Sequence, residues 1–342
     1  MHRSKSSPQN QSEMISIACA ASEEQLLAEQ SPVQLLKTGL NNGLCKGWSG
    51  FLWMLKILLP ISFLTALLEW TGWLGKVDFV IQPVMGLLGL PAAAALPLII
   101  GMLTSVYGGI AAMMMLPFSK EQMTLMAIFL LIAHNLIQEG IIQGKSGLHP
   151  LLATGVRLVA AVVTVFCTSR FLGTGAAVDA VALNNAVTAA KPFLHALRQW
   201  AVAMSHLSLK IFLIIMAIMV LLESLKALGW ISHIVRVLQP FLKTLGLSPR
   251  VGMLWMTAVV FGLAYGAAVI VEEAKRGDLS RQDLQQLQLS IGINHSMVED
   301  PSLFLSLGLS AFWLWVPRLI TAIIAVRLFS LWGSLRRRSL AN

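Results

Sequence analysis

Long apolar runs dominate this chain and leave it few ways to fold. The run MTLMAIFLLIAHNLIQEGII, residues 123–142, is typical, because about 20 mostly apolar residues are what an α-helix needs to cross a bilayer. Hydrophobic residues make up 56% of the 342 residues and charged residues only 12%, whereas soluble domains carry roughly a quarter. The sequence therefore predicts an all-α integral membrane protein with several spans, whose apolar surface contacts lipid.

The net charge of +9 points to membrane topology rather than to a nucleic-acid partner. An excess of Lys and Arg in a membrane protein marks cytoplasmic loops and tails. The basic cluster Arg336, Arg337 and Arg338 therefore predicts a cytoplasmic C-terminus, in a multi-pass protein of the inner (cytoplasmic) membrane. The three cysteines form no CxxC pair, so the sequence suggests neither a disulfide framework nor a thiolate metal site.

Short motifs recur in the same order and divide the chain into two copies of one unit. LKI…LLE at residues 55–69 returns at residues 209–223, and later motifs follow in register. The matching pairs include Lys56 with Lys210, Trp73 with Trp230, Pro83 with Pro240, Tyr107 with Tyr265, His134 with His295 and Arg157 with Arg318. We predict a polar cytoplasmic tail (1–49), a first membrane repeat (50–172), a linker (173–205), a second membrane repeat (206–330) and a basic tail (331–342).

Each repeat is predicted to contain five helical segments. In order, they are a long helix (51–70; 207–227), a short amphipathic segment (77–88; 232–245), a helix interrupted by glycine (92–116; 250–273), a helix carrying a histidine (120–143; 281–299) and a helix carrying an arginine (149–171; 302–330). The short segment decides the topology. If it crosses the membrane, the two repeats are inverted, and if it is re-entrant or interfacial, they are parallel. The sparsely charged linker favours inversion.

Polar residues cluster once on the fourth segment of each copy. We call these two clusters the polar boxes: HNLIQEG (134–140) in the first copy and HSMVEDP (295–301) in the second. Residues four apart share one face of a helix. We therefore expect His134 to pair with Gln138, Asn135 with Glu139, His295 with Glu299 and Ser296 with Asp300. Ionisable groups inside a membrane cost at least a few kcal/mol each and persist when they face a partner, a cavity or an ion. The boxes predict an ion- or substrate-binding site, with His134, His295, Glu139 and Glu299 as metal ligands.

A structural interpretation competes with the binding site. Asp300 precedes Pro301, which favours an N-cap over a ligand. Asn135 and Gln138 can simply join helices, and a histidine that donates to a backbone carbonyl is common in helix interfaces. Arg157 and Arg318 are expected to pair with the acids of their own copy, because a buried charge favours a partner.

The glycine breaks supply a second candidate. Tyr107 and Tyr265 are the only tyrosines of the chain and fall at matching places in TSVYGG and GLAYGA. Glycines there allow close helix packing or an unwound stretch that lines a substrate site. Catalytic signatures such as HExxH, GxSxG and GxxxxGK[ST] are absent from the sequence, so we predict neither an enzyme nor a cofactor.

Two related stretches carry a resemblance to a known family. GLLGLPAAAALPLIIGMLTSVYGGIAAMMM (86–115) and TLGLSPRVGMLWMTAVVFGLAYGAAVIVEE (244–273) each place a Leu-Gly-Leu turn before a Gly-broken apolar helix. They resemble the Gate or "nucleoside recognition" domain of ferrous-iron permeases, concentrative nucleoside transporters and spore-maturation membrane proteins. This chain has no GTPase domain, and Cys167 has no counterpart in the second copy, so neither iron nor nucleoside follows as substrate.

The resemblance implies a gate-type helical bundle that moves a small solute. We expect a permease whose site lies between the repeats, with a metal or other cation favoured over a nucleoside. The alternative is a non-transporting membrane scaffold or an envelope- or spore-assembly subunit, in which the polar boxes only join helices. An intramembrane enzyme ranks third, and the sequence leaves a homo-oligomer open.

Overall fold

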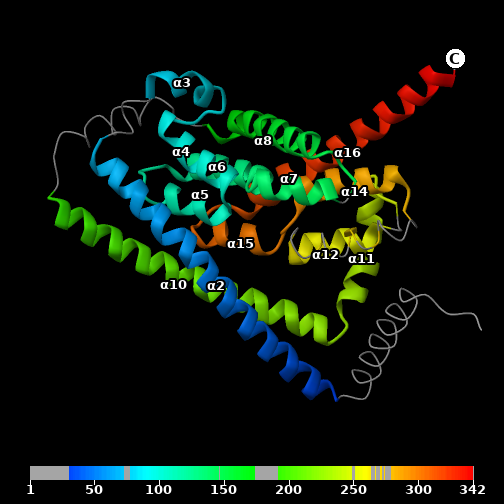
Figure 1. The fold of residues 1–342 in the computed structure, drawn as a ribbon, viewed down its shortest axis with the longest axis horizontal. Coiled ribbons are helices and arrows are strands. Elements are labelled where there is room, and N and C mark those ends of the chain that lie inside the picture. Colours follow the sequence, from blue (N-terminus) through cyan, green and yellow to red (C-terminus); the bar gives the residue numbers. More distant parts are fainter. Residues whose placement is uncertain are drawn as a thin grey trace, which may run out of the picture.

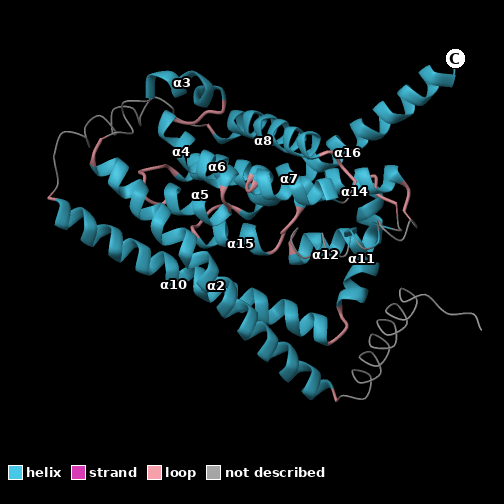
Figure 2. Cartoon of the chain, viewed as in Figure 1, coloured by secondary structure: helices cyan, strands magenta, loops and turns pink. Residues whose placement is uncertain are grey.

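The computed structural model describes most of the predicted membrane region. It covers residues 31–72, 78–145, 147–173, 192–248, 251–262 and 279–341, with residues 266, 270, 271 and 273 of the intervening segment. All regular structure within these residues is helical, and no strand occurs among them (Figure 2). The prediction of an all-α protein is confirmed. The first 30 residues and most of the predicted linker lie outside the described part.

The two longest helices start earlier than their apolar runs predicted. They are α2 (Pro32–Trp70) and α10 (Phe193–Ala227). A capping box begins α2, in which the Ser31 side chain accepts from the Gln34 backbone and the Gln34 side chain accepts from the Ser31 backbone. The cap satisfies the exposed amides of the first turn, so helix forms ahead of the apolar run.

Helices α2 and α10 lie side by side and antiparallel along one flank of the molecule (Figure 1). The ring centroids of Phe51 and Phe212 are 4.9 Å apart, and those of Trp70 and Phe193 are 5.3 Å apart. The end of one helix therefore contacts the beginning of the other. These two helices are the first segments of the two predicted repeats.

Small residues bring the two helix backbones together. A Cβ added to Gly43 would lie 2.5 Å from the Val220 Cα, and one added to Gly39 would lie 2.7 Å from the Ser224 Cα. Glycines four residues apart permit this approach in membrane helices. Beside them, Lys46 Nζ donates to Glu223 at 2.7 Å across the interface.

The third segment is broken in both halves, within the glycine-containing stretches TSVYGG (104–109) and GLAYGA (262–267) that the sequence singled out, at Thr104–Ser105 in the first and at Gly262 in the second. In the first half it consists of a 3₁₀ turn η2 (Ala92–Ala94), α4 (Ala95–Leu103) and α5 (Val106–Met113). Ser105 begins α5 by accepting a hydrogen bond from the Gly108 backbone. In the second half, α12 (Gly252–Phe261) ends at Gly262, whose φ of +82° belongs to glycine.

The fourth segment differs from the prediction, because it is two helices in each half rather than one. They are α6 (Lys120–Ala133) and α7 (Leu136–Lys145) in the first half, with α14 (Arg281–Asn294) and α15 (Glu299–Ser306) in the second. The breaks fall at His134–Asn135 and His295–Ser296. Asn135 and Ser296 adopt φ of +48° and +51°, which a continuous helix cannot accommodate.

The two broken units also run antiparallel. Gly147, just after α7, lies beside Leu284 near the start of α14, since a Cβ on Gly147 would be 3.8 Å from that side chain. Gly308, just after α15, lies beside Lys120 at the start of α6 in the same way. The end of each unit therefore meets the start of the other, and the breaks meet in the middle.

The remaining helices flank this centre: α3 (Asp78–Leu87), α8 (Pro150–Leu172), α11 (Ile231–Thr244) and α16 (Ala311–Ala341). Helices α3 and α11 are the short segments that the sequence predicted. Helix α16 extends past residue 330 and carries the C-terminal end away from the bundle (Figure 1).

Five stretches of the described chain are long and apolar enough to cross a membrane. They are Pro32–Trp70, Lys120–Lys145, Pro150–Leu172, Phe193–Ala227 and Ala311–Gly333. Many large apolar side chains on these helices are exposed, among them Leu64, Val159 and Leu209. A soluble protein seldom exposes so many, whereas a lipid-facing surface requires them. The chain is an all-helical membrane protein.

Candidate functional site

One histidine from each helix break lies in the buried centre of the protein, where the two side chains are in contact. His134 and His295 are 6% and 2% exposed, and their Nε2 atoms are 3.3 Å apart. The ring centroids are separated by 4.9 Å. The two residues lie 161 positions apart in the sequence and come from the two halves of the chain. The transport hypothesis required this proximity, because rings held far apart would have excluded a shared site.

The backbone at each break is fixed by the neighbouring broken helix. The Asn135 amide donates to the Gly101 carbonyl of α4 at 2.9 Å, and the Met297 amide donates to the Val259 carbonyl of α12 at 2.8 Å. Hydrogen bonds of this kind satisfy amides that an unbroken helix would use internally. The glycine-interrupted third segments therefore position the histidines of the fourth.

Each imidazole is oriented by its own helix. His134 Nδ1 donates to the Leu130 carbonyl at 2.8 Å, and His295 Nδ1 donates to the Ile291 carbonyl at 2.9 Å. These are the backbone contacts that the structural interpretation predicted. They occupy only one nitrogen of each ring, and the other nitrogen points into the centre.

Glu139 joins the two histidines. Its Oε1 lies 3.2 Å from His134 Nε2, and its Oε2 lies 3.3 Å from His295 Nε2. Oε2 also contacts Arg157 Nη1 at 2.7 Å, as expected for an arginine and an acid of the same copy. All four side chains are buried. The centre thus combines a carboxylate, a guanidinium and two imidazoles, supplied by both halves.

The two arginines close the ends of the broken helices. Arg157 Nε and Nη2 donate to the carbonyls of Ile132 and His134 at 2.9 and 2.8 Å. Arg318 makes the corresponding bonds at the end of α14, including one from Nη2 to the His295 carbonyl at 3.0 Å. Helix C-termini present unpaired carbonyls and partial negative charge, which a cation stabilises. Both side chains are almost fully buried.

The pairings expected from a continuous helix are wrong, because the break rotates the following residues. Glu139, five residues after His134, reaches the histidine, whereas Gln138 is exposed and accepts a hydrogen bond from the Asn135 side chain. Ser296 is buried at its break, and its amide contacts the Ala258 carbonyl at 3.4 Å.

Neither acid after His295 has the role that the sequence predicted. Glu299 accepts a hydrogen bond from the Tyr107 hydroxyl of the other half at 2.5 Å rather than pairing with His295. Asp300 is not the N-cap of α15, which Val298 occupies, and its Oδ2 lies 3.7 Å from His134 Nε2. Tyr107 therefore belongs to the centre. Tyr265 lies outside the described residues.

A group of amides beside the centre was missed by the sequence reasoning. Gln288 and Asn294 are buried on α14, and neither side-chain amide has a hydrogen-bond partner among the described residues. Gln143 of α7 donates to the Gln288 carbonyl at 2.8 Å. The sequence did contain a signal for this group. Helix α14 (RQDLQQLQLSIGIN) is rich in side-chain amides, whereas the equivalent helix α6 (KEQMTLMAIFLLIA) is mostly apolar.

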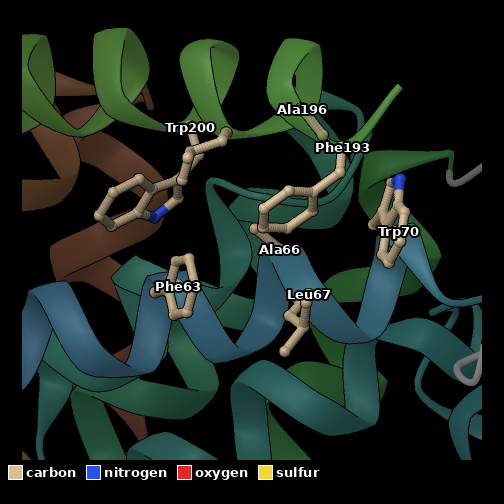
Figure 3. Close-up of a pocket in the computed structure, with 8 residues that line it drawn as sticks. Phe63, Ala66, Leu67, Trp70, Phe193, Ala196 and Trp200 are labelled. Atoms are coloured by element: carbon tan, nitrogen blue, oxygen red, sulfur yellow. The ribbon is translucent and has the colours of Figure 1, made fainter. Parts of the chain in front are cut away.

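An apolar pocket between α2 and α10 is separate from this centre. Figure 3 shows Phe63, Leu67 and Trp70 of α2 facing Phe193 and Trp200 of α10. The lining carries no ionisable group. Interfacial tryptophans and phenylalanines commonly contact lipid at helix ends, so we do not assign a solute to this pocket.

The fold and the centre define a class: a multi-pass helical membrane protein with a buried histidine–glutamate–arginine cluster whose members come from both halves of the chain. Residues 51–176 match the family model Gate, described as nucleoside recognition. That family is associated with membrane transporters and permeases.

A relative supports the membrane assignment. The chain is 29% identical over 283 residues to "Uncharacterized membrane protein YvoD" of Bacillus subtilis (strain 168), covering 82% of this chain and 91% of that protein. No solved structure matches the chain.

Proposed function

We propose that the protein is a permease that moves a small solute through the centre formed by His134, Glu139 and His295. The observation that carries this proposal is the contact of two buried histidines from different halves at 3.3 Å, each at a helix break. Repeat transporters bind their solute near the midplane, where broken helices of two halves meet. Charged groups that only held one half together would have no reason to converge there.

The two halves are proposed to be inverted repeats, over residues 50–172 and 206–330. Helix α2 is antiparallel to α10, and the α6–α7 unit is antiparallel to the α14–α15 unit. Equivalent segments that cross a membrane in opposite directions give an inverted repeat. Alternating access then follows from one half rocking against the other.

A metal or other small cation is favoured over a nucleoside as the solute. The groups that converge are two imidazoles and carboxylates, which suit a cation. The hydroxyl of Tyr107, an aromatic residue beside these groups, donates a hydrogen bond to Glu299. A nucleoside site would present an aromatic face with amides.

The proposed setting is the inner membrane, with lipid around the bundle and a cytoplasmic C-terminus. Three arginines in α16, beyond the apolar stretch that ends at Gly333, support this orientation.

A membrane scaffold is the second candidate. The arginine-capped helix ends and the histidine–carbonyl bonds favour it, because each is made within one half. A scaffold needs these bonds and no solute.

Ligand-dependent stability distinguishes the two. The purified protein in detergent is heated with divalent metals and with nucleosides, and a ligand of the native state raises the unfolding temperature as ln(1 + [L]/Kd). Uptake of the stabilising solute into liposomes then tests transport. A permease predicts a response that His134→Ala/His295→Ala loses. A scaffold predicts no ligand response and a double variant that is only less stable.

A further inference from the structure

Two nitrogen lone pairs face one another at the centre. Because each histidine donates from Nδ1 to a carbonyl, the Nε2 of each neutral ring is an acceptor. These two acceptors are buried and lie 3.3 Å apart. Two acceptors cannot hydrogen-bond each other, so a positive species between them is required to make the contact favourable.

Glu139 adds a third acceptor to the same point. An ionised carboxylate accepts and cannot donate, and its two oxygens lie 3.2 and 3.3 Å from the two Nε2 atoms. Arg157 contacts only Oε2 at 2.7 Å, which leaves Oε1 directed at His134. Three acceptors therefore converge from three sides.

The spacing of these acceptors matches the edge of a metal tetrahedron. Zinc binds His nitrogen and carboxylate oxygen at about 2.0–2.1 Å, and a tetrahedron of such bonds separates its ligand atoms by about 3.3–3.4 Å. The two Nε2 atoms are 3.3 Å apart, and Glu139 lies 3.2 Å from that of His134 through Oε1 and 3.3 Å from that of His295 through Oε2. One ligand atom from each of the three residues lies within 4.8 Å of the other two, so small shifts bring all three to the spacing of a metal site.

We propose that His134, His295 and Glu139 bind one divalent first-row transition metal ion, with Asp300 as the fourth ligand. Asp300 Oδ2 lies 3.7 Å from His134 Nε2, is buried and has no hydrogen-bond partner among the described residues. Glu299, predicted as a ligand from the sequence, is engaged by Tyr107. Two neutral imidazoles and two carboxylates balance the charge of a divalent ion.

The surroundings of the ligands are those of a metal site. Metal-binding histidines almost always donate their other ring nitrogen to a carbonyl or carboxylate, and ligating carboxylates are themselves hydrogen-bonded. Here the Nδ1–carbonyl bonds and Arg157 fill these roles, and the arginine's charge is shared with the carbonyls at the end of α6. Two nitrogens among four ligands disfavour Mg²⁺ and Ca²⁺, which take six or more oxygens.

This inference deepens the proposed function and rests on it only for the claim that the metal is the transported solute. Binding is tested on the full-length protein, purified in detergent through a tag without histidine. The protein is stripped with chelator and titrated with Zn²⁺, Mn²⁺ and Co²⁺. We expect one ion per chain, competition among the three metals and no competition from Mg²⁺ in large excess.

Cobalt reports the geometry without any variant. A tetrahedral Co²⁺ site absorbs visible light far more strongly than an octahedral one, so the wild-type spectrum tests the four-ligand arrangement directly. We expect the intense tetrahedral bands, and Zn²⁺ should abolish them. An octahedral spectrum, or no binding of any of the three metals by the wild type, would overturn the site.

Variants then assign the ligands. We expect His134→Ala and His295→Ala each to weaken Zn²⁺ binding at least 100-fold, and Asp300→Asn at least 10-fold. Arg157→Lys should weaken it about 10- to 100-fold, as outer-shell partners do. The matched control is His206→Ala, which removes an exposed histidine of α10 and should leave binding unchanged. Full binding by both central histidine variants would contradict the assignment.

Uptake by liposomes separates this inference from the proposed function. Metal bound by the wild type without metal uptake supports the site and counts against transport. Uptake of another solute by a protein that binds no metal supports transport and rejects the site.

Discussion

Arg157 shows how one side chain serves both the fold and the site. Its guanidinium donates to two carbonyls at the end of α6 and contacts Glu139 at 2.7 Å. Removing it would open the helix end and leave a buried carboxylate without its cation. A broken buried ion pair costs more than a lost surface pair, because the remaining charge stays desolvated.

We predict that Arg157→Gln lowers the free energy of unfolding by about 3–5 kcal/mol. Thermal unfolding in detergent measures this against Arg198→Gln, which removes an exposed arginine of α10 and should change stability by about 0.5 kcal/mol or less. Equal unfolding temperatures for the two variants would show that the contacts of Arg157 do not contribute to stability.

Residue types were predictable from the sequence, and their partners were not. His134, His295 and Glu139 stood out because ionisable groups are expensive in an apolar run. Their pairing depended on a break at Asn135 that no Gly or Pro announces, so residues four apart were paired where residues five apart meet. Asp300 was predicted to be an N-cap because it precedes Pro301, and an Asp before a Pro is common at the start of a helix.

At the scale of elements, the break itself is the feature to test. Asn135 holds φ of +48°, a conformation that Asn tolerates, Gly adopts readily and β-branched residues avoid. We predict that Asn135→Gly keeps the wild-type stability and Asn135→Val loses about 1–3 kcal/mol. Thermal unfolding of the pair measures the difference. A valine variant as stable as the glycine variant would mean that the positive φ at residue 135 is not needed for the folded state.

The α2–α10 interface makes a separate prediction. Gly43→Ala should destabilise the protein by about 1–3 kcal/mol, because the new Cβ would lie 2.5 Å from the Val220 Cα and force the helices apart. Gly50→Ala on the same helix meets nothing within 4 Å and should be neutral or slightly stabilising. Thermal unfolding of both variants is the measurement, and the close packing is refuted if Gly43→Ala matches Gly50→Ala.

Most element types could be predicted from hydropathy and glycine placement, including the short α3 and α11 and the breaks of the third segment. The starts of α2 and α10 could not be predicted from hydropathy, because both lie in sequence that is too polar for a membrane-spanning helix. Ser31 and Gln34 form a capping box that signals the start of α2. The packing of Gly39 and Gly43 against a helix more than 150 residues away is tertiary information.

At the scale of the whole molecule, inversion makes a topological prediction. Lys120 and Arg281 occupy the first positions of α6 and α14 and are both exposed. In a chain whose native cysteines are replaced by serine, we expect Lys120→Cys and Arg281→Cys to react with an impermeant maleimide from opposite sides of the membrane. Labelling of intact and permeabilised vesicles distinguishes the sides. Reaction of both cysteines from one side would establish parallel repeats.

The meeting of one histidine from each half has a consequence for how such a protein could arise. A gene encoding a single half would carry one of the two central histidines and one of the two arginines that cap the broken helices, and no complete centre. Because the two broken units are antiparallel, such a half could build the centre only by inserting into the bilayer in both orientations and pairing with itself. Fusion of two copies would fix each orientation once, and only then could the two equivalent acids become different, as Glu139 and Asp300 are at the offset of 161 that relates His134 to His295.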